Sequence, residues 1–156
     1  MKQVKATPPE LDALPGFFIR RLQQIAVAIF LEETEGRGIT PVQFAALAGV
    51  QRQPGIDQRT LARGIGLDTS TIGGVIDRLE ARGLMRRNAS PQDRRVRLLT
   101  LSDAGQALLQ SLLPPVSRAQ ERMLAPLPPA DRERFMQMLC QLVEANNALS
   151  RAPSDA

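Results

Sequence analysis

The sequence predicts a mainly α-helical protein that carries one small β-hairpin. Apolar residues recur at intervals of three and four along most of the chain, which is the spacing of helix faces. The chain has five Phe but no Trp or Tyr, so its core must be built from aliphatic side chains that suit helix packing. This spacing changes to alternation only at 84–101, where two short strands are expected.

The first expected helix runs from Leu14 to Glu33. Its apolar stripe consists of Leu14, Phe18, Leu22, Ile25 and Ile29. A segment with two glycines, 35–38, ends it. Thr40 then has the features of an N-cap, with Pro41 at the first helical position and Gln43 placed to complete a capping box. A second helix is therefore expected from Pro41 to a stop at 54–55.

Two shorter helices with a glycine turn between them follow. Asp57 is expected to cap the first and Asp68 the second, which extends to about Arg82. Gly66 supplies the turn, and Gly83 ends the second helix. This order is typical of a helix-turn-helix. The strands expected at 84–88 and 96–101, joined by the polar loop 89–94, would then form a wing.

A long helix is expected after Ser102, with an apolar stripe of Leu108, Leu112, Val116, Ala119 and Met123. Because proline lacks an N–H and collides with the preceding turn, the pair 114–115 should kink or break it. Prolines at 126, 128 and 129 predict the next break. A last helix follows Asp131, with a stripe of Phe135, Met138, Leu139, Leu142 and Leu149.

Composition excludes several classes of function. The chain has no His, which removes imidazole acid–base chemistry and most zinc and iron sites, and its single cysteine, Cys140, rules out a disulfide within the chain. We therefore expect no enzyme activity, catalytic residue, cofactor or metal. No apolar run approaches the roughly 20 residues that span a bilayer. The polar segment Met1–Pro9 lacks a signal region, so a cytoplasmic protein without a membrane partner is expected.

Positive charge is concentrated in the predicted helix-turn-helix and wing. Residues 57–97 contain nine Arg and five Asp or Glu, and this segment alone accounts for the net charge of +4. Thr69, Ser70 and Thr71 lie in the first turn of the second helix, where hydroxyls can meet phosphates or bases. The alternative is that these hydroxyls only cap the helix. The charge pattern favours double-stranded DNA as the partner.

Gly73 and Gly74 lie opposite the buried stripe of the same helix. Two adjacent glycines inside a helix cost roughly 1 kcal/mol each relative to Ala, so a reason for them is needed. Glycine would allow this helix to approach another backbone or base edges closely.

The wing is expected to contact the minor groove of DNA. Five arginines fall within residues 86–97, and Asp93 precedes Arg94 and Arg95 at the loop. A narrow A·T groove attracts a guanidinium, and a neighbouring carboxylate can fix its direction. The alternative is a solvated loop with an internal ion pair, which contributes less than about 1 kcal/mol.

These motifs resemble those of the MarR family of winged helix-turn-helix regulators. The runs 57–62, 67–72 and 77–84 are similar to its DNA-binding core, and 90–95 with 99–105 are similar to its wing and the next helix. The resemblance implies one domain over 1–156, with dimerisation helices at 10–38 and 102–150 around a winged helix-turn-helix at 40–101. With the arginine pattern, it gives the expected DNA-binding residues as Arg59, Thr69, Ser70, Thr71, Gly73, Gly74, Arg78, Asp93, Arg94 and Arg95.

The resemblance further implies a homodimer on a pseudo-palindromic operator, acting as a repressor that a small, often aromatic and anionic, ligand releases. Candidate ligand residues are Phe17, Arg20, Arg21, Gln24 and Phe44, because an arginine beside aromatic rings suits an aromatic carboxylate or phenol. The alternative is that these rings are core and the arginines are solvated or lie in a dimer contact.

Two departures from the family pattern are visible. Larger polar residues are commoner than the Gly73–Gly74 pair at those positions, so fewer side chains would read bases here. Peroxide-sensing members use a cysteine near the first helix, whereas Cys140 falls in the last helix and is expected to be a buried packing residue. The rival function is a winged-helix protein without an effector, acting constitutively or through protein partners.

Overall fold

The computed structural model describes residues 9–153, so the polar segment expected at the N-terminus lies outside them except for Pro9. The helices are α1 (Pro15–Glu33), α2 (Pro41–Arg52), α3 (Gln58–Gly64), α4 (Thr69–Ala81), α5 (Asp103–Leu124) and α6 (Pro129–Asn146). The strands are β1 (Ile56–Asp57), β2 (Met85–Ala89) and β3 (Arg97–Leu101). Short 3-10 turns occupy Leu11–Ala13 and Asn147–Leu149. None of the described helices is long and apolar enough to cross a membrane.

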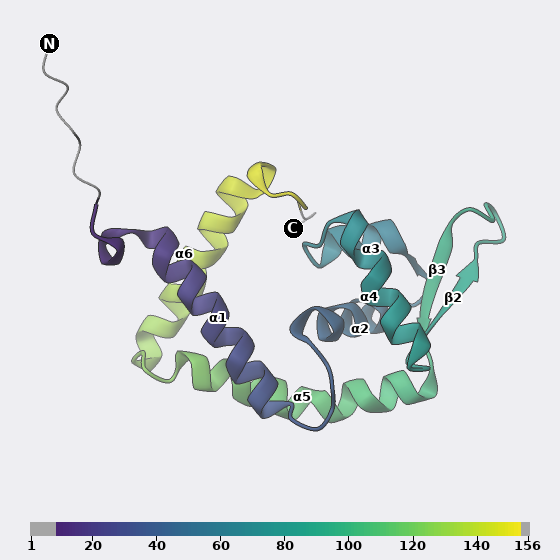
Figure 1. The fold of residues 1–156 in the computed structure, drawn as a ribbon, viewed down its shortest axis with the longest axis horizontal. Helices are drawn as coiled ribbons and strands as arrows, with labels where there is room; N and C mark the ends of the chain where they lie inside the picture. Colours follow the sequence, from purple (N-terminus) through teal and green to yellow (C-terminus); the bar gives the residue numbers. More distant parts are fainter. Residues whose placement is uncertain (1–8, 154–156) are drawn as a thin grey trace, which may run out of the picture.

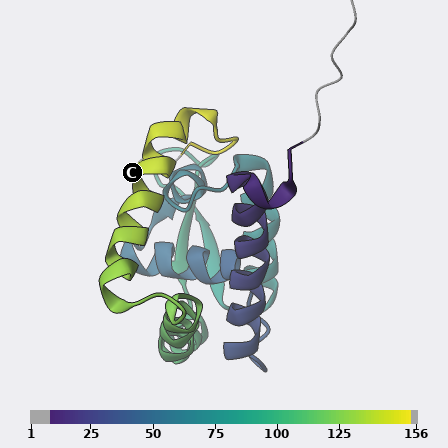
Figure 2. The same ribbon diagram turned by 90° about the vertical axis from the view of Figure 1, so that its left-hand side faces the viewer.

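Helix α5 connects two parts of the molecule (Figure 1). At one end lies the lobe, defined here as residues 39–101, which holds α2–α4 and the strands. At the other end α1 and α6 stand on either side of α5 and form the arm (Figures 1 and 2). Ion pairs join the arm to α5: Arg118 Nε lies 3.1 Å from Glu33 Oε2, and Arg122 Nη2 lies 2.7 Å from Glu32 Oε2.

The lobe contains most of the hydrophobic core. The four residues expected on the inner face of α4 are all buried, and they pack with α2, α3 and β3. Leu109 and Leu112 of α5 close this core from below, which fixes the lobe on α5. The buried apolar residues of α2–α4 are Ala46, Leu47, Val50, Leu61, Ala62, Ile72, Val75, Ile76 and Leu79.

The expected helix caps are confirmed. Thr40 Oγ1 accepts from the Gln43 amide at 3.2 Å, and the Gln43 side chain accepts from the Thr40 amide at 3.1 Å. Asp57 accepts from Thr60 N at 2.9 Å, and Asp68 accepts from the amides of Ser70 and Thr71. These bonds satisfy N–H groups that a helix start leaves without partners.

The sheet has one more strand than the sequence indicated. β3 pairs antiparallel with β2, as expected for a wing, and also with the two-residue strand β1 through Ile56–Leu99 and Asp57–Leu98. β1 places the start of α3 beside the base of the wing. Leu99 is fully buried between the two neighbouring strands, whereas Leu98 is half-buried.

Two expectations for the C-terminal helices are corrected. Of the kink or break expected at Pro114 and Pro115, the break does not occur, because α5 continues from Asp103 to Leu124. Cys140 is exposed, and α6 has no buried residue in this single chain. The apolar stripe of α6 therefore faces outward, as do Phe18 and Ile25 of α1.

The junction between lobe and α5 depends on a close backbone approach. Ser102 Oγ donates to Gly83 O at 2.5 Å and accepts from Gly105 N at 3.0 Å, while Ser102 N donates to Leu84 O at 3.2 Å. A Cβ atom placed on Gly105 would lie 1.9 Å from Leu84 O. Only glycine fits here without moving one backbone away from the other.

Candidate nucleic-acid interface

Helix α4 begins with a cluster of hydroxyls around one carboxylate. The hydroxyls of Ser70 and Thr71 both donate to Asp68, the latter at 2.9 Å. The hydrogen bonds from the Ser70 and Thr71 side chains hold the pKa of Asp68 below its ordinary value. The helix is thus capped by Asp68, and the hydroxyls of Ser70 and Thr71 donate to this capping carboxylate. Ser70 and Thr71 remain exposed, as does Thr69, so this turn can still meet a phosphate.

The two glycines of α4 do not approach another backbone within the described residues. A Cβ on Gly73 would lie 3.5 Å from Nε2 of Gln58, and a Cβ on Gly74 would lie 4.0 Å from Nη1 of Arg78. Both are ordinary contacts with side chains. Arg78 is exposed on the same helix. The sequence suggested that these glycines allow close approach either to another backbone or to base edges. Close approach to another backbone of the protein does not occur among residues 9–153, which leaves base edges.

At the wing, a carboxylate forms hydrogen bonds to an arginine. Asp93 Oδ1 accepts from Arg95 N at 3.0 Å and from Arg95 Nε at 3.3 Å. The Arg95 side chain is 92% exposed, and Arg94 is exposed beside it. Because the pair is solvated, it adds little stability, but it does set the direction of the Arg95 guanidinium.

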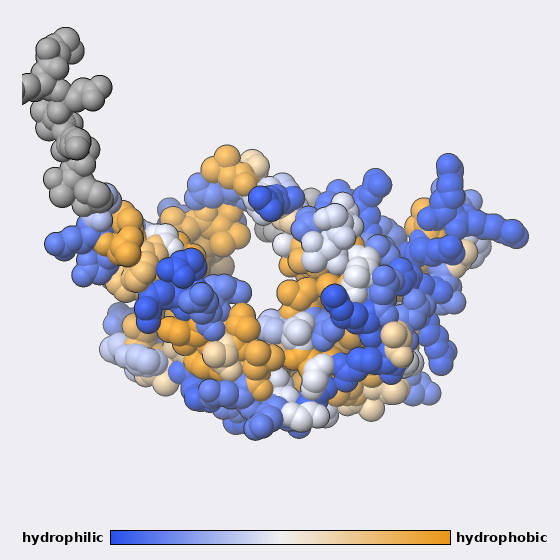
Figure 3. Space-filling model, in the orientation of Figure 1, coloured by the Kyte–Doolittle hydropathy of each residue, from blue (hydrophilic) through white to orange (hydrophobic). Residues whose placement is uncertain are grey.

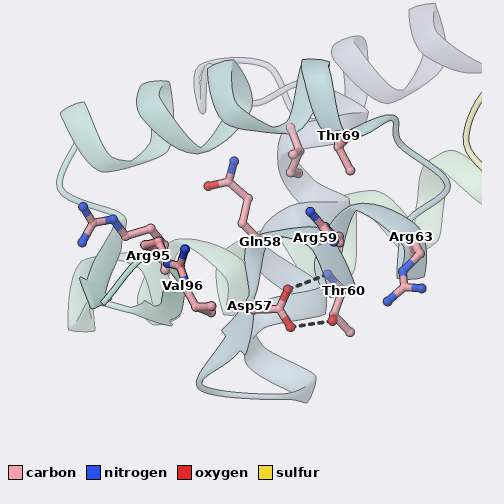
Figure 4. A pocket seen from close by; sticks show the side chains of 10 residues that line it. Asp57, Gln58, Arg59, Thr60, Arg63, Thr69, Arg95 and Val96 are labelled. Atoms are coloured by element: carbon pink, nitrogen blue, oxygen red, sulfur yellow. Dashed lines mark hydrogen bonds between the residues drawn. The ribbon is translucent and has the colours of Figure 1, made fainter. Parts of the chain in front are cut away.

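A groove brings the helix-turn-helix and the wing together (Figure 4). It has a volume of about 610 Å³ and joins three of the predicted DNA-binding residues: Arg59, Thr69 and Arg95. Sequence reasoning did not single out Gln58, Thr60 or Arg63 for it, although the positive charge of 57–97 pointed to this part of the chain. The lining residues are Asp57, Gln58, Arg59, Thr60, Arg63, Thr69, Ile72, Arg95, Val96 and Arg97.

Asp57 is the acidic residue in that groove. Its carboxylate accepts from the amide of Thr60 at 2.9 Å and from the hydroxyl of the same residue at 2.5 Å. Burial acts to raise the pKa of Asp57, but the hydrogen bonds from Thr60 outweigh it and leave this pKa lowered. The group is therefore an ionised cap that the helix start neutralises in part.

One arginine of the wing forms ion pairs with carboxylates of the same chain. Arg87 of β2 contacts Asp77 and lies with Nε 3.1 Å from Oε2 of Glu80. Its pKa is raised by the hydrogen bond to Asp77, with a further contribution from Glu80. This clasp ties β2 to the outer side of α4 and neutralises two carboxylates near the interface.

The residues predicted to bind a ligand fall into two places. Phe17 of α1 contacts two arginines, with the guanidinium carbons of Arg20 and Arg21 at 5.6 and 5.8 Å from its ring centroid. Gln24 is exposed one turn further along α1. Phe44 of α2 instead packs against Phe30, with ring centroids 6.1 Å apart. Phe44 therefore contacts the core near the other end of α1.

Comparison with known proteins settles the family. The family model described as MarR family matches residues 39–96, which is nearly the whole lobe. The transcriptional regulator HosA of Escherichia coli O111:H- is 30% identical over 107 residues, covering 69% of this chain and 79% of HosA. The chain belongs to the MarR family. It is thus a DNA-binding transcriptional regulator, and its relatives are regulators rather than enzymes.

Solved MarR-family structures superimpose over almost the whole chain. The PcaV regulator of Streptomyces coelicolor, in complex with its natural ligand, is 34% identical with a TM-score of 0.84, covering 90% of this chain and 99% of PcaV. BpsR of Bordetella bronchiseptica is 29% identical with a TM-score of 0.82, covering 87% and 97%. That structure concerns regulation of DNA binding by 6-hydroxynicotinic acid.

Proposed function

We propose that this MarR-family protein is a homodimeric repressor of a pseudo-palindromic operator that a small aromatic acid or phenol releases. The observation that carries the DNA-binding part is the groove, in which Arg59, Thr69 and Arg95 come together from α3, α4 and the wing. Residues 40–101 bind DNA in this proposal, and residues 10–38 and 102–150 form the dimer.

In this proposal α4 enters the major groove and the wing the adjacent minor groove. Thr69, Ser70, Thr71 and the two glycines present a small, polar surface to the bases, and Arg78 lies further along the same helix. Arg95, held by Asp93, inserts into the minor groove with Arg94 beside it. Arg59 contacts phosphates, which hold the protein on the duplex without reading sequence.

Arginine-to-alanine variants test these roles. Arg95→Ala should weaken binding to a duplex selected from a random library by roughly 1–3 kcal/mol. Arg59→Ala should weaken selected and mixed-sequence duplexes alike and flatten the dependence of affinity on salt. Arg134→Ala, which removes an exposed arginine from α6, is the matched control and should bind as wild type does. Unchanged affinity for both Arg94→Ala and Arg95→Ala would remove the wing from the mechanism.

The dimer proposal rests on uncovered apolar surface in the arm. Phe18 of α1 and Leu142 of α6 are 53% and 56% exposed, and apolar surface borders the open space between arm and lobe (Figure 3). The further exposed apolar residues of these helices are Ile19, Ile25, Leu31, Met136, Met138 and Val143. Pairing the arms of two chains about a two-fold axis would bury this surface.

Light scattering tests the assembly directly. At micromolar concentration the protein should show about twice the chain mass of 17.1 kDa. Leu142→Glu should shift the equilibrium toward monomer, because a charge would be buried in the contact. Gln120→Glu, at an exposed position of α5, should leave the dimer intact. A wild-type monomer would contradict both the dimer and the palindromic operator, whose half-sites lie about 34 Å apart.

The effector proposal rests on the aromatic and cationic cluster of α1. Arg20 and Arg21 can pair with a carboxylate while Phe17 contacts the ring of an aromatic acid, with Gln24 as a further polar contact and Phe44 on the lobe side. The 6-hydroxynicotinic acid of the BpsR study has this chemistry. A ligand between arm and lobe would favour one spacing of the two recognition helices.

Ligand titration against the protein–DNA complex tests the effector. Benzoate-like, cinnamate-like and hydroxynicotinate-like acids should release the selected duplex. The acid should weaken DNA binding by about 1–3 kcal/mol, and DNA should weaken binding of the acid by the same amount. Arg21→Ala should reduce release without changing DNA affinity. If no acid releases wild type, the protein acts without this effector class. Equal release of both proteins would show that Arg21 is not the anchor.

A further inference from the structure

Gln58 places an unpaired amide in the groove between α4 and the wing. It is the first residue of α3, and its side chain extends from the groove floor toward α4 (Figure 4). Within residues 9–153 its carboxamide has no hydrogen-bond partner, and its polar atoms are not sealed from solvent. A half-buried amide without a partner inside the protein is available to a ligand in the groove.

The bare surface of Gly73 makes room for this amide. Nε2 of Gln58 lies 3.5 Å from the position that a Cβ on Gly73 would occupy, so the amide packs over the α4 backbone. A Cβ at position 73 would make an ordinary contact with the amide, whereas a longer side chain would compete with it for this space.

The positions proposed for α4 and the wing on DNA indicate what would occupy the groove between them. If α4 lies in the major groove and the wing in the minor groove, one sugar–phosphate strand separates them. That strand must cross the surface between α4 and the wing, and this surface is the groove. Of the arginines that line it, Arg59 and Arg63 come from α3, whereas Arg95 and Arg97 come from the wing loop and β3. Arginines from both elements suit a chain of phosphates.

We propose that Gln58 is a positioning residue that donates its amide N–H to a phosphate oxygen of the strand in the groove. Gly73 keeps the space in which the amide and the strand meet. This inference rests on the proposed function, because it requires α4 and the wing to occupy adjacent grooves. A neutral donor releases no counterion from DNA, so its contribution does not change the salt dependence of binding, unlike that of the surrounding arginines.

Two substitutions at Gln58 separate this role from others. Gln58→Ala should weaken a selected duplex and a mixed-sequence duplex of about three helical turns by a similar factor, about 10- to 100-fold, because a hydrogen bond to a charged phosphate is lost. The slope of log affinity against log salt should stay at the wild-type value. Gln58→Glu should bind more weakly still, because its carboxylate faces the phosphate. Glutamate also suits a helix start, so this variant should fold.

The control is Gln51→Ala, which removes an exposed glutamine of α2 that does not line the groove and should bind as wild type does. Wild-type affinity of both Gln58 variants overturns the inference while the proposed function stands. Loss confined to the selected duplex also overturns it, because Gln58 would then read a base. If wild type binds neither duplex at low salt, the proposed function itself fails.

Discussion

Replacing Gly105 by alanine should destabilise the protein strongly, although alanine is the better helix former. The added Cβ would lie 1.9 Å from Leu84 O and 2.9 Å from Leu84 C, and both atoms belong to the backbone. No side-chain rotation can relieve this overlap. Helix α5 must therefore move away from the end of the lobe by about 1 Å to restore an allowed contact of about 3 Å.

The cost can be worked from the contacts at this junction. Overpacking a filled site costs about 1–3 kcal/mol. A shift of that size also stretches the bonds of Ser102 to Gly83 O and Leu84 O, and each hydrogen bond contributes about 0.5–1.5 kcal/mol. The helix propensity of alanine returns about 1 kcal/mol. The net expectation is a loss of about 3 kcal/mol, or a melting temperature lower by about 6–12 °C.

Thermal melts and urea titrations at equal protein concentration check this value. Gly74→Ala is the matched control, because it is also a helical glycine but its Cβ would meet nothing closer than Arg78 Nη1 at 4.0 Å. That variant should be as stable as wild type or more stable by up to about 1 kcal/mol. A Gly105→Ala protein that melts within about 2 °C of wild type would refute the argument from backbone contact.

Three further predictions concern the caps and the clasp. The pKa of Asp68 is lowered from its ordinary 3.8, so its ionised form stabilises the fold above that pH, and this contribution is lost as pH falls through the lowered pKa. Asp68→Asn should therefore flatten the acid side of a plot of unfolding free energy against pH. An unchanged acid side would contradict this. Thr40→Ala should cost about 1 kcal/mol in urea unfolding, since it removes the capping box; a loss below about 0.3 kcal/mol would be too small for a capping role. Arg87→Ala should weaken DNA binding, measured by fluorescence anisotropy, because it leaves two carboxylates without their cation. Adding Asp77→Asn to that variant should restore part of the affinity. No recovery would show that charge is not the cause.

Sequence reasoning succeeded where the deciding interactions are local. The caps at Thr40, Asp57 and Asp68 bind amides two or three residues away, so the residue order contains all the information required. Gly83 adopts a positive φ of 70° at the end of α4, which the same local rule predicts. The fold class followed, because helix starts, stops and faces define most of this architecture.

Sequence reasoning failed where contacts between segments far apart in the sequence determine the structure. β1 has two residues and no periodicity, and it exists only because β3 is beside it. α5 continues through Pro114–Pro115, where Leu112, Pro115 and Ala119 are buried against other elements. The exposure of Cys140 depends on what covers α6.

The candidate site follows the same division. Asp93 and Arg95 are two residues apart, and their contact was foreseen from that spacing. The groove could not be foreseen, because Gln58 and Gly73 meet only when α3 packs against α4. Arg87 was counted with the wing charge, yet its partners lie seven and ten residues away on another element. Roles on DNA and ligand remain predictions for all these residues.

The tight junction at Gly105 turns α5 into a lever. The lobe is locked to one end of this 22-residue helix, and the arm grips the other half through Glu33 and Arg118. The helix is about 33 Å long, so a tilt of about 6° at the arm displaces the lobe by about 3.5 Å. That is close to the rise of one base-pair step, about 3.4 Å. In the proposed dimer, a rearrangement smaller than a side chain at the arm would therefore be enough to move α4 out of register with its half-site on DNA.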